Sequence, residues 1–429
     1  MISVELSEWS EGTPDNTPQL HGYRIRDRTA RAQAEALSRL GIIDFGALER
    51  GLLIRSFSFV GRVTLDDLTV TVRPKMASNA LLQLLRYAYS LQDLRIFEAT
   101  SFGEGIEGLH DLLIAQLEAE ARELLRRGPI RRYLPRSEDL MSPRGRIDVQ
   151  RLARSAIEGS SSVPCTHHPR SSDSLLNRVV RAGLMLGRSL TAQRPLRRAL
   201  ASTEALFADL CSTTRIDGQV LDAADRALDR LSVGYSSAVR LIRLLHDSNH
   251  LALEHGSLQL DGFMFDMNRF FQALLQKFLT DSLPDCTVAS ERSLQRMMTY
   301  ATGFNPRGRR PPNPRPDFVV SSARRTYLLD AKYRDLWRNE LPREMLYQLA
   351  IYAMSQPTGS TAAILYPTEE AEATESIIEI ADPMSTATRA RVALRPVVIP
   401  RLMRLINAFR ENVRERHAWA TELVIGSAG

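Results

Sequence analysis

The sequence contains few cysteines and no long hydrophobic run. Its three cysteines, Cys165, Cys211 and Cys286, lie far apart and form no CxxC pair, which argues against a disulfide framework and against a structural zinc site. No apolar run approaches the ~20 residues that a membrane-spanning helix needs, and the first residues lack the basic and apolar regions of a signal peptide. We therefore expect a cytoplasmic protein that is not secreted and has no membrane partner.

Lysine is equally scarce. Of the 56 basic residues only Lys75, Lys277 and Lys332 are lysines, so the other 53 are arginines (56 minus 3). None of the three follows a glycine, which excludes the Walker A motif of P-loop nucleotide hydrolases. The formal net charge of +6 and the pI near 9.4 are compatible with a polyanionic partner but do not require one. Chemistry that needs an ammonium group therefore has only three candidate residues.

The composition is that of an ordinary globular protein. With 429 residues, of which 44% are hydrophobic and 25% charged, the chain is long enough for two or three separately cored domains. Residues 51–61 and 67–73 alternate apolar and polar side chains around a turn, and an apolar helix is expected at 80–89. This pattern predicts a β-rich region over residues 1–108.

Helical periodicity dominates the middle of the chain. Residues 109–261 are predicted to be mainly helical, with helices at 110–127 and 173–190 and a loop at 158–164. From residue 262 to 429 the expected order is a helix, a strand, a Pro/Arg loop, two strands, and then helix, strand and helix. Strands mixed with covering helices predict an α/β layer architecture for this C-terminal region.

Three charged residues stand out on the two strands that follow the Pro/Arg loop. Residues 317–320 and 326–332 are joined by a polar stretch and are predicted to form a hairpin. A turn centred between residues 323 and 324 places Asp317 opposite Asp330, with Cβ atoms ~5 Å apart. Lys332, two residues after Asp330, then points to the same face.

Two acids and an amine on one face are suited to hydrolysis of a phosphodiester bond. Mg²⁺ prefers oxygen ligands and keeps several waters, so Asp317, Asp330 and a substrate phosphate can hold it. Lys332 would orient or help deprotonate the attacking water and offset phosphate charge. The alternative is that these are solvated strand-end charges or an ion pair. The apolar residues at 318–320 and 328–329 favour the first interpretation, because charges at the ends of core strands need a partner or a metal.

With these residues identified, the sequence resembles the PD-(D/E)xK nuclease superfamily, and in particular McrC, the nuclease subunit of McrBC-type modification-dependent restriction systems. The resemblance is carried by Pro316-Asp317, by Asp330-Ala-Lys332-Tyr and by Gln348-x-x-x-Tyr352, and is strongest over residues 266–367. It implies a C-terminal PD-(D/E)xK domain, preceded by the β-rich and helical regions, that cuts DNA with Mg²⁺. The implied catalytic residues are Asp317, Asp330, Lys332, Gln348 and Tyr352.

The resemblance also implies metal ligands and partners. The ligands would be Asp317, Asp330 and Gln272, where Gln272 stands at a position usually held by Glu in the family. An amide oxygen binds Mg²⁺ more weakly than a carboxylate. Proteins of the McrC family work with a separate McrB-like AAA+ GTPase hexamer, on which the region before residue 260 would dock, and their substrate is double-stranded DNA. Two alternatives remain open: a stand-alone repair nuclease, and a catalytically degenerate adaptor of an AAA+ motor.

Three further motifs stand out in the sequence. Arg307, Arg309, Arg310 and Arg315 lie in the Pro-rich loop before Asp317 and would bind the DNA backbone, although a merely solvated loop fits the sequence as well. Residues 103–108 match GxGxxG, but their two glutamates would repel a pyrophosphate, so a connector is expected. Residues 165–168, Cys-Thr-His-His, lack a fourth ligand for zinc and are expected to be a surface loop.

Overall fold

The chain folds into two compact units. The computed structural model describes residues 2–76, 78–89, 109–133, 135–157, 161–250, 261–295, 297–323, 325–408 and 411–426. One unit combines residues 1–92 with 264–429, and the other contains residues 93–263. The beginning and the end of the chain therefore belong to one unit. The division into functional regions at 1–108, 109–261 and 262–429 stays a prediction.

The N-terminal part of the first unit is β-rich, as predicted, and has two small sheets. One sheet has the strand order β1 (Ile2–Ser7), β6 (Leu68–Arg73), β5 (Phe59–Leu65) and β12 (Asp261–Asp266), and the other β2 (Glu11–Gly12), β4 (Gly51–Ser56) and β3 (Ile43–Leu48). The run 51–61 is divided between β4 and β5, which belong to different sheets. The helical elements here are η1 (Pro18–Leu20), α1 (Arg28–Arg39) and α2 (Ser78–Ala88), and α2 confirms the predicted apolar helix.

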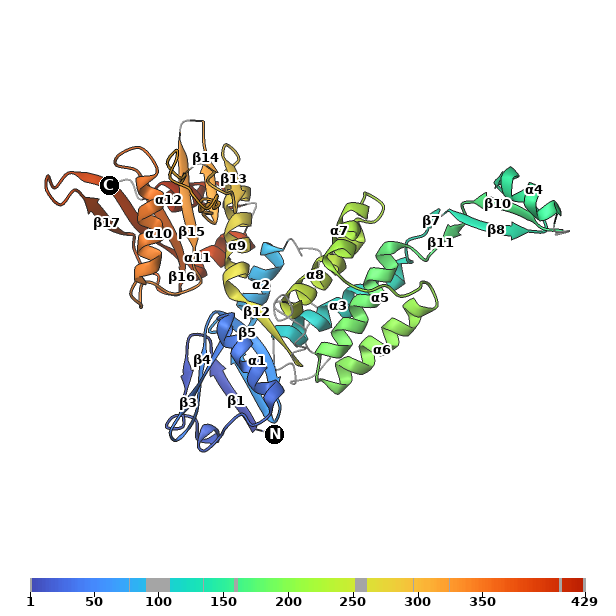
Figure 1. The fold of residues 1–429 in the computed structure, drawn as a ribbon, viewed down its shortest axis with the longest axis horizontal. Coiled ribbons are helices and arrows are strands. Elements are labelled where there is room, and N and C mark those ends of the chain that lie inside the picture. The colour runs from blue at the N-terminus through green and yellow to red at the C-terminus, as the bar shows by residue number, and fades with distance from the viewer. Residues whose placement is uncertain are drawn as a thin grey trace. The chain divides into compact units, whose positions relative to one another are not determined.

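A six-stranded mixed sheet forms the C-terminal part of the same unit. Its strand order is β13 (Thr287–Ser290), β14 (Phe318–Ser321), β15 (Thr326–Ala331), β16 (Thr361–Thr368), β18 (Thr388–Val398) and β17 (Ser376–Ala381). Strands β15, β16 and β18 run parallel, and the other pairs are antiparallel. Helix α10 (Arg343–Met354) packs on one face, and α9 (Met267–Ser282), α11 (Ile399–Asn407) and α12 (Val413–Ile425) cover the other (Figure 1). The predicted mixed α/β architecture is confirmed.

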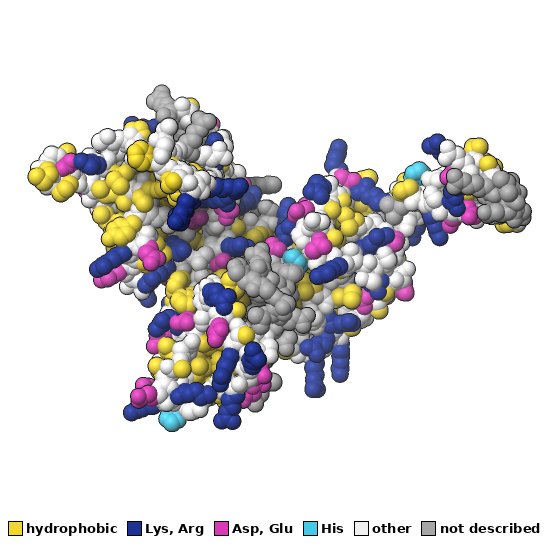
Figure 2. All heavy atoms as spheres, viewed as in Figure 1, with side chains coloured by type: hydrophobic (Ala, Val, Ile, Leu, Met, Phe, Trp, Pro, Cys, Tyr) yellow, Lys and Arg dark blue, Asp and Glu magenta, His cyan; other side chains and the backbone are white. Residues whose placement is uncertain are grey.

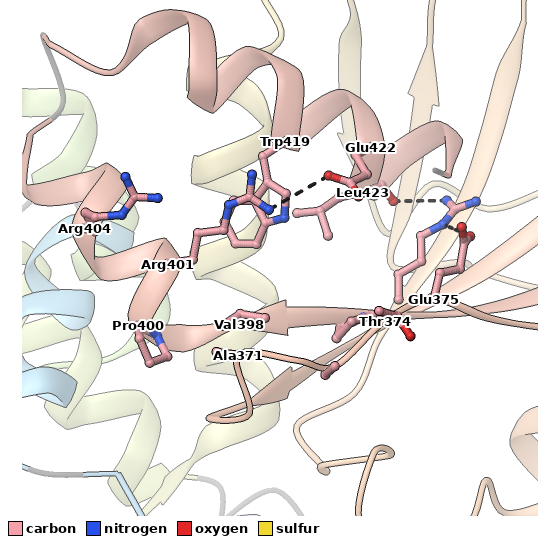
Figure 3. A pocket seen from close by; sticks show the side chains of 13 residues that line it. Ala371, Thr374, Glu375, Val398, Pro400, Arg401, Arg404, Trp419, Glu422 and Leu423 are labelled. Atoms are coloured by element: carbon pink, nitrogen blue, oxygen red, sulfur yellow. Dashed lines mark hydrogen bonds and ion pairs between the residues drawn. The ribbon is translucent and has the colours of Figure 1, made fainter. Parts of the chain in front are cut away.

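A buried arginine fastens the last helix to this sheet. Arg395 on β18 is 4% exposed, and its guanidinium donates a 2.7 Å hydrogen bond to Glu375. Figure 3 shows the side chains of Glu375 and Leu423, two of the residues that Arg395 contacts. Its guanidinium also donates to the carbonyl oxygens of Leu423, Val424 and Ile425 at the end of α12. These carbonyls have no partner inside the helix, so the cation satisfies them and complements the negative end of the helix dipole.

The second unit is mainly helical, as predicted, and carries small β elements. Its helical elements are α3 (Leu109–Arg127), α4 (Val149–Ile157), α5 (Leu175–Leu190), α6 (Arg194–Ala208), α7 (Gly218–Ala227), η3 (Val233–Tyr235) and α8 (Ser236–His250). Its strands are β7 (Arg132–Tyr133), β8 (Arg136–Leu140), β9 (Arg146–Ile147), β10 (Val163–His167) and β11 (Arg170–Ser171). Helices α3 and α5 coincide with the predicted amphipathic helices.

Two segments of this unit that were predicted to be loops lie partly in a strand. The prediction of a surface loop at 165–168 is wrong for its first residues. Cys165 lies in the middle of β10 and is 1% exposed. A small apolar thiol is well suited to a buried strand position. The end of the loop predicted at 158–164 also belongs to β10, since that strand begins at Val163. The GxGxxG connector at 103–108 lies outside the described residues. Among the residues that are described, no helix is long and apolar enough to cross a membrane.

Candidate active site

Asp317 and Asp330 face one another at the open end of the β14–β15 hairpin. Phe318 pairs with Leu329 and Val319 with Leu328, and the same register continues to Asp317 opposite Asp330. The backbone N–H of Asp317 donates to Oδ1 of Asp330 at 3.4 Å. The predicted register is thus confirmed. Because side chains alternate along a strand, both carboxylates share the face of Val319 and Leu328, which packs against α10.

Both carboxylates sit in surroundings that disfavour their charge. Burial raises the pKa of Asp330 to about 7, and the neighbouring charge of Asp317 adds to the shift. Burial likewise raises the pKa of Asp317, although the N–H of Ala331, which donates to its Oδ2 at 2.7 Å, and the charge of Lys332 oppose this. A pair of acids in this state is incompletely neutralised by the protein groups around it.

Lys332 lies one residue beyond the end of β15. Its N–H still donates to the carbonyl oxygen of Leu365 at 3.0 Å, so the backbone follows the strand direction for one more residue. Lys332 is half-buried, and its positive charge lowers the pKa values of Asp317, Asp330 and Asp266. The ammonium therefore lies within electrostatic reach of all three carboxylates. The structure therefore brings the predicted amine to the predicted acids.

Helix α10 brings Tyr352 and Gln348 to the same place. Tyr352 is 3% exposed, and its hydroxyl accepts a 3.0 Å hydrogen bond from Nε2 of the exposed Gln348 one helical turn earlier. Burial raises the pKa of Tyr352, and the charges of Asp330 and Asp317 raise it further. Tyr352 thus lies beside the acid pair, whereas the contact that the structure gives Gln348 at this site is made through Tyr352.

Helix α9 contributes Gln272 and Asp266. Nε2 of Gln272 donates to Oδ1 of Asp317 at 3.2 Å, so Gln272 belongs to the cluster. Asp266 is the N-cap of α9, and its carboxylate accepts hydrogen bonds from the N–H groups of Asn268 and Arg269. Burial raises the pKa of Asp266 in spite of these bonds. Asp266 therefore holds the helix that presents Gln272 to Asp317.

Glu291 is a neighbour of Asp317 that sequence reasoning missed. It follows β13 directly, and its N–H donates to the carbonyl oxygen of Asp317 at 3.1 Å. Its charge contributes to the raised pKa of Asp317. Its backbone φ is +48°, a left-handed conformation that residues other than glycine seldom adopt. No motif surrounds Glu291 in the sequence, and a left-handed backbone cannot be seen in a Ser-Glu-Arg triplet.

The four arginines predicted to bind DNA are all exposed. Arg307, Arg309, Arg310 and Arg315 make no ion pair with any described residue. Asn305 shapes the loop, because its side chain accepts from the N–H of Arg309 and donates to its carbonyl oxygen, both at 2.9 Å. Basic and acidic side chains are interspersed over the visible face of the molecule (Figure 2), so overall charge does not single out a DNA-binding surface there.

In the described part of the chain, no three His, Cys, Asp or Glu side chains gather in an arrangement that could hold a metal ion. The cluster at the open end of the hairpin has two facing carboxylates, one amide and one ammonium. Oxygen ligands of this kind suit a hard cation such as Mg²⁺, which keeps several waters, better than they suit zinc.

Comparison with known proteins identifies a family that matches this chain. The family described as McrBC 5-methylcytosine restriction system component matches residues 54–367. A comparison with curated proteins found no match. The chain is similar to one in a refined half-complex from a tetradecameric assembly of Thermococcus gammatolerans McrB AAA+ hexamers with bound McrC. The sequence identity is 17% and the TM-score 0.57, and the similarity covers 95% of this chain and 100% of that chain.

A second similar chain comes from the cryo-EM structure of the Thermococcus gammatolerans McrBC complex, with 18% identity, a TM-score of 0.45, and coverage of 68% of this chain and 90% of that chain. The first of these two similarities shows a shared fold. The family match extends over more than half of the sequence and includes both aspartates and the lysine of the site. This chain therefore belongs to the McrBC 5-methylcytosine restriction system component family.

Proposed function

We propose that this chain is the McrC-type endonuclease subunit of a McrBC-like restriction and antiphage defence complex, with a C-terminal PD-(D/E)xK domain. The observation that carries the proposal is the buried pair Asp317 and Asp330, with Lys332 within electrostatic reach. Solvated charges or a simple ion pair would have ordinary or lowered pKa values. Burial instead raises the pKa values of both carboxylates, and a neighbouring negative charge, Asp317 for Asp330 and Glu291 for Asp317, adds to each shift. Raised pKa values of this kind are typical of groups arranged for chemistry.

The residues present fit Mg²⁺. Two facing carboxylates supply oxygen ligands and have charge to be neutralised, and Mg²⁺ is usually held by one or two carboxylates with water and substrate phosphate. In the structure the amide nitrogen of Gln272 donates to Asp317. Rotation of this amide by 180° would present its oxygen to the cation instead. When bound, Mg²⁺ supplies a Lewis acid that lowers the pKa of a water and offsets phosphate charge.

The side chains of the chain have separate tasks in this scheme. Asp317 and Asp330 would hold the cation through their carboxylate oxygens. Lys332, as an ammonium, orients the attacking water and stabilises the charge that develops on the phosphate. Tyr352, held by Gln348, closes the α10 side of the site and restricts access of bulk water to the two acids.

The substrate in this proposal is double-stranded DNA. The four exposed arginines of the loop at 307–315 lie shortly before Asp317 in the sequence and have no acidic partner among the described residues. Guanidinium groups bind phosphate oxygens in a bidentate manner, so the loop is suited to the DNA backbone beside the scissile bond. This contact is independent of base sequence.

The partner in this proposal is a McrB-like AAA+ GTPase hexamer. The sequence has no Walker A motif, and in this proposal another protein supplies the motor. The solved structure that shares the fold is an assembly of McrB AAA+ hexamers with bound McrC. The region before residue 260 would dock on the motor and stimulate GTP hydrolysis.

A partner-dependent cleavage assay tests the proposal. The full chain is mixed with its McrB-like partner, GTP, and methylated or unmethylated DNA, in Mg²⁺ or in EDTA. Cleavage that requires both Mg²⁺ and the partner is expected. Cleavage without the partner would favour the stand-alone nuclease, and stimulation of GTP hydrolysis without any cleavage would favour the degenerate adaptor, for which Gln272 is the sequence argument.

A further inference from the structure

The position of Lys332 depends on contacts outside its own strand. The pairing of β15 with β16 ends at Ala331 opposite Leu365. The N–H of Lys332 still bonds to Leu365, but the peptide that follows turns away, because the N–H of Arg334 donates to the carbonyl oxygen of Lys332 at 2.8 Å. The direction of the Lys332 side chain is therefore set by whatever holds Tyr333, the residue at the centre of this turn.

Tyr333 is held at every polar atom that it has. Its N–H donates to Oδ1 of Asn268 at 3.1 Å, and its carbonyl oxygen accepts from Nε1 of Trp9 at 3.1 Å. Its hydroxyl donates to Oε1 of Glu8 at 3.0 Å. Two of these three partners come from the segment directly after β1, more than 320 residues away in sequence. The side chain itself is 6% exposed and packs edge-on against Phe271 at 6.0 Å.

The partners on the N-terminal side are themselves fixed. Trp9 has a backbone φ of +55°, which residues other than glycine rarely adopt, and in this conformation its N–H donates to Phe57 at 3.2 Å. The guanidinium of Arg334 lies over its ring at 5.6 Å. Glu8 is 1% exposed, and its Oε1 also accepts from the N–H of Lys75 at 2.7 Å. A strained backbone and a buried acid are costly to maintain, and such features persist where the surrounding structure needs them.

We propose that Glu8 and Trp9 are positioning residues for Lys332, acting through Tyr333, so that the N-terminal sheet is part of the nuclease centre. The inference rests on the proposed function for the role of Lys332, but the contact itself does not. Positioning of Lys332 by Glu8 and Trp9 makes DNA cleavage sensitive to the N-terminal sheet. This sheet belongs to the region proposed to dock on the motor. Docking that shifts the segment after β1 would then move the catalytic amine directly.

The first test is the chemical reactivity of Lys332 and requires no nuclease activity. The chain has only three lysines, so reductive methylation followed by peptide mass spectrometry measures each one separately. Lys277, which pairs with Asp281 at 2.9 Å, is the internal reference. We expect Trp9→Phe, which keeps a ring but loses Nε1–H, to change the labelling rate of Lys332 severalfold and to leave Lys277 unchanged. An unchanged rate at Lys332 would overturn the proposal.

The matched control for this substitution is Trp337→Phe. Trp337 is 42% exposed and makes none of the contacts to Tyr333 described above. Its replacement removes the same indole N–H from the protein without touching the Glu8 and Trp9 contacts. The labelling rate of Lys332 is expected to equal that of the unmodified chain. An equal change in both variants would mean that the effect is not transmitted through Tyr333, and it would also overturn the proposal.

The second test separates positioning from stability in the complete complex. Tyr333→Phe is expected to lower kcat for partner-dependent cleavage about tenfold and to leave KM for DNA unchanged, because a displaced catalytic group affects the transition state. Glu8→Gln keeps an acceptor oxygen and is expected to retain activity. The double variant Glu8→Gln with Tyr333→Phe keeps an acceptor for the N–H of Lys75 and buries no carboxylate, so it is expected to regain thermal stability but not kcat. Recovery of kcat together with thermal stability would show that the contact between Glu8 and Tyr333 has only a structural role, and it would overturn the proposal.

If the unmodified complex cleaves no DNA, the proposed function fails, and the labelling experiment still decides whether Glu8 and Trp9 hold Lys332.

Discussion

Replacing Asp330 with asparagine should stabilise the metal-free protein above neutral pH. Burial and the charge of Asp317 raise the pKa of Asp330 from 3.8 to about 7. A carboxyl group whose folded-state pKa is raised contributes stability that is fully present below the unfolded pKa and is lost as the pH rises through the folded pKa. The loss therefore falls between about pH 4 and pH 7. At about 1.4 kcal/mol for each pKa unit, the full effect is at most about 4 kcal/mol.

Calorimetry of the full chain at pH 5 and pH 8 measures this effect. In EDTA, the Tm of the unmodified chain should be lower at pH 8 than at pH 5. This decrease should be several degrees larger than the decrease for Asp330→Asn. Addition of Mg²⁺ at pH 8 should raise the Tm of the unmodified chain and leave that of the variant nearly unchanged, because bound ligand stabilises only the protein that binds it. Parallel pH profiles for the two proteins would refute the reasoning that Asp330 is an uncompensated buried acid.

Three further variants test other parts of the site. Tyr352→Phe removes the hydroxyl that accepts from Gln348, and it should lower partner-dependent cleavage about tenfold in a kinetic assay, with little change in Tm. Replacing Arg309 and Arg310 with glutamine should weaken DNA binding in a salt titration and reduce the slope of log K against log salt by about 2, one for each lost phosphate contact. Unchanged slopes would remove the loop from the DNA interface. Gln272→Glu adds a third carboxylate, so it should lower Tm in EDTA and tighten Mg²⁺ binding in calorimetric titration; weaker binding would show that the amide is not at the metal site.

Much of the fold could be predicted from sequence periodicity. Helices α3 and α5 and the β14–β15 hairpin fall where the pattern predicts them, because each depends on local spacing of apolar side chains and on nearby turn residues. The register of the hairpin places Asp317 opposite Asp330 as expected. The apolar strand at Cys165 was expected to be a loop, because a short strand flanked by Ser, Pro and His gives almost no periodic signal.

The parts of the site that could not be predicted are long-range or conformational. Glu8 and Trp9 meet Tyr333 across more than 320 residues, and no local pattern encodes such a contact. The left-handed backbone at Glu291 is likewise invisible in the residue types around it. Strand alternation alone does not fix the side chain of Lys332, because β15 ends at Ala331 and the next residues are held by tertiary contacts. The spacing of the motif therefore predicted that Asp317 and Asp330 face one another. The residues that surround Lys332 could be identified only in the structure.

The central claim is that Asp330 belongs to a metal-dependent nuclease centre that is separate from stimulation of the motor. The most direct measurement is partner-dependent DNA cleavage and GTP hydrolysis in parallel, for the unmodified chain and for Asp330→Ala. We expect the variant to lose cleavage and to keep full stimulation of GTP hydrolysis. Cleavage that survives in the variant would contradict the assignment of Asp330 and with it the proposed active site.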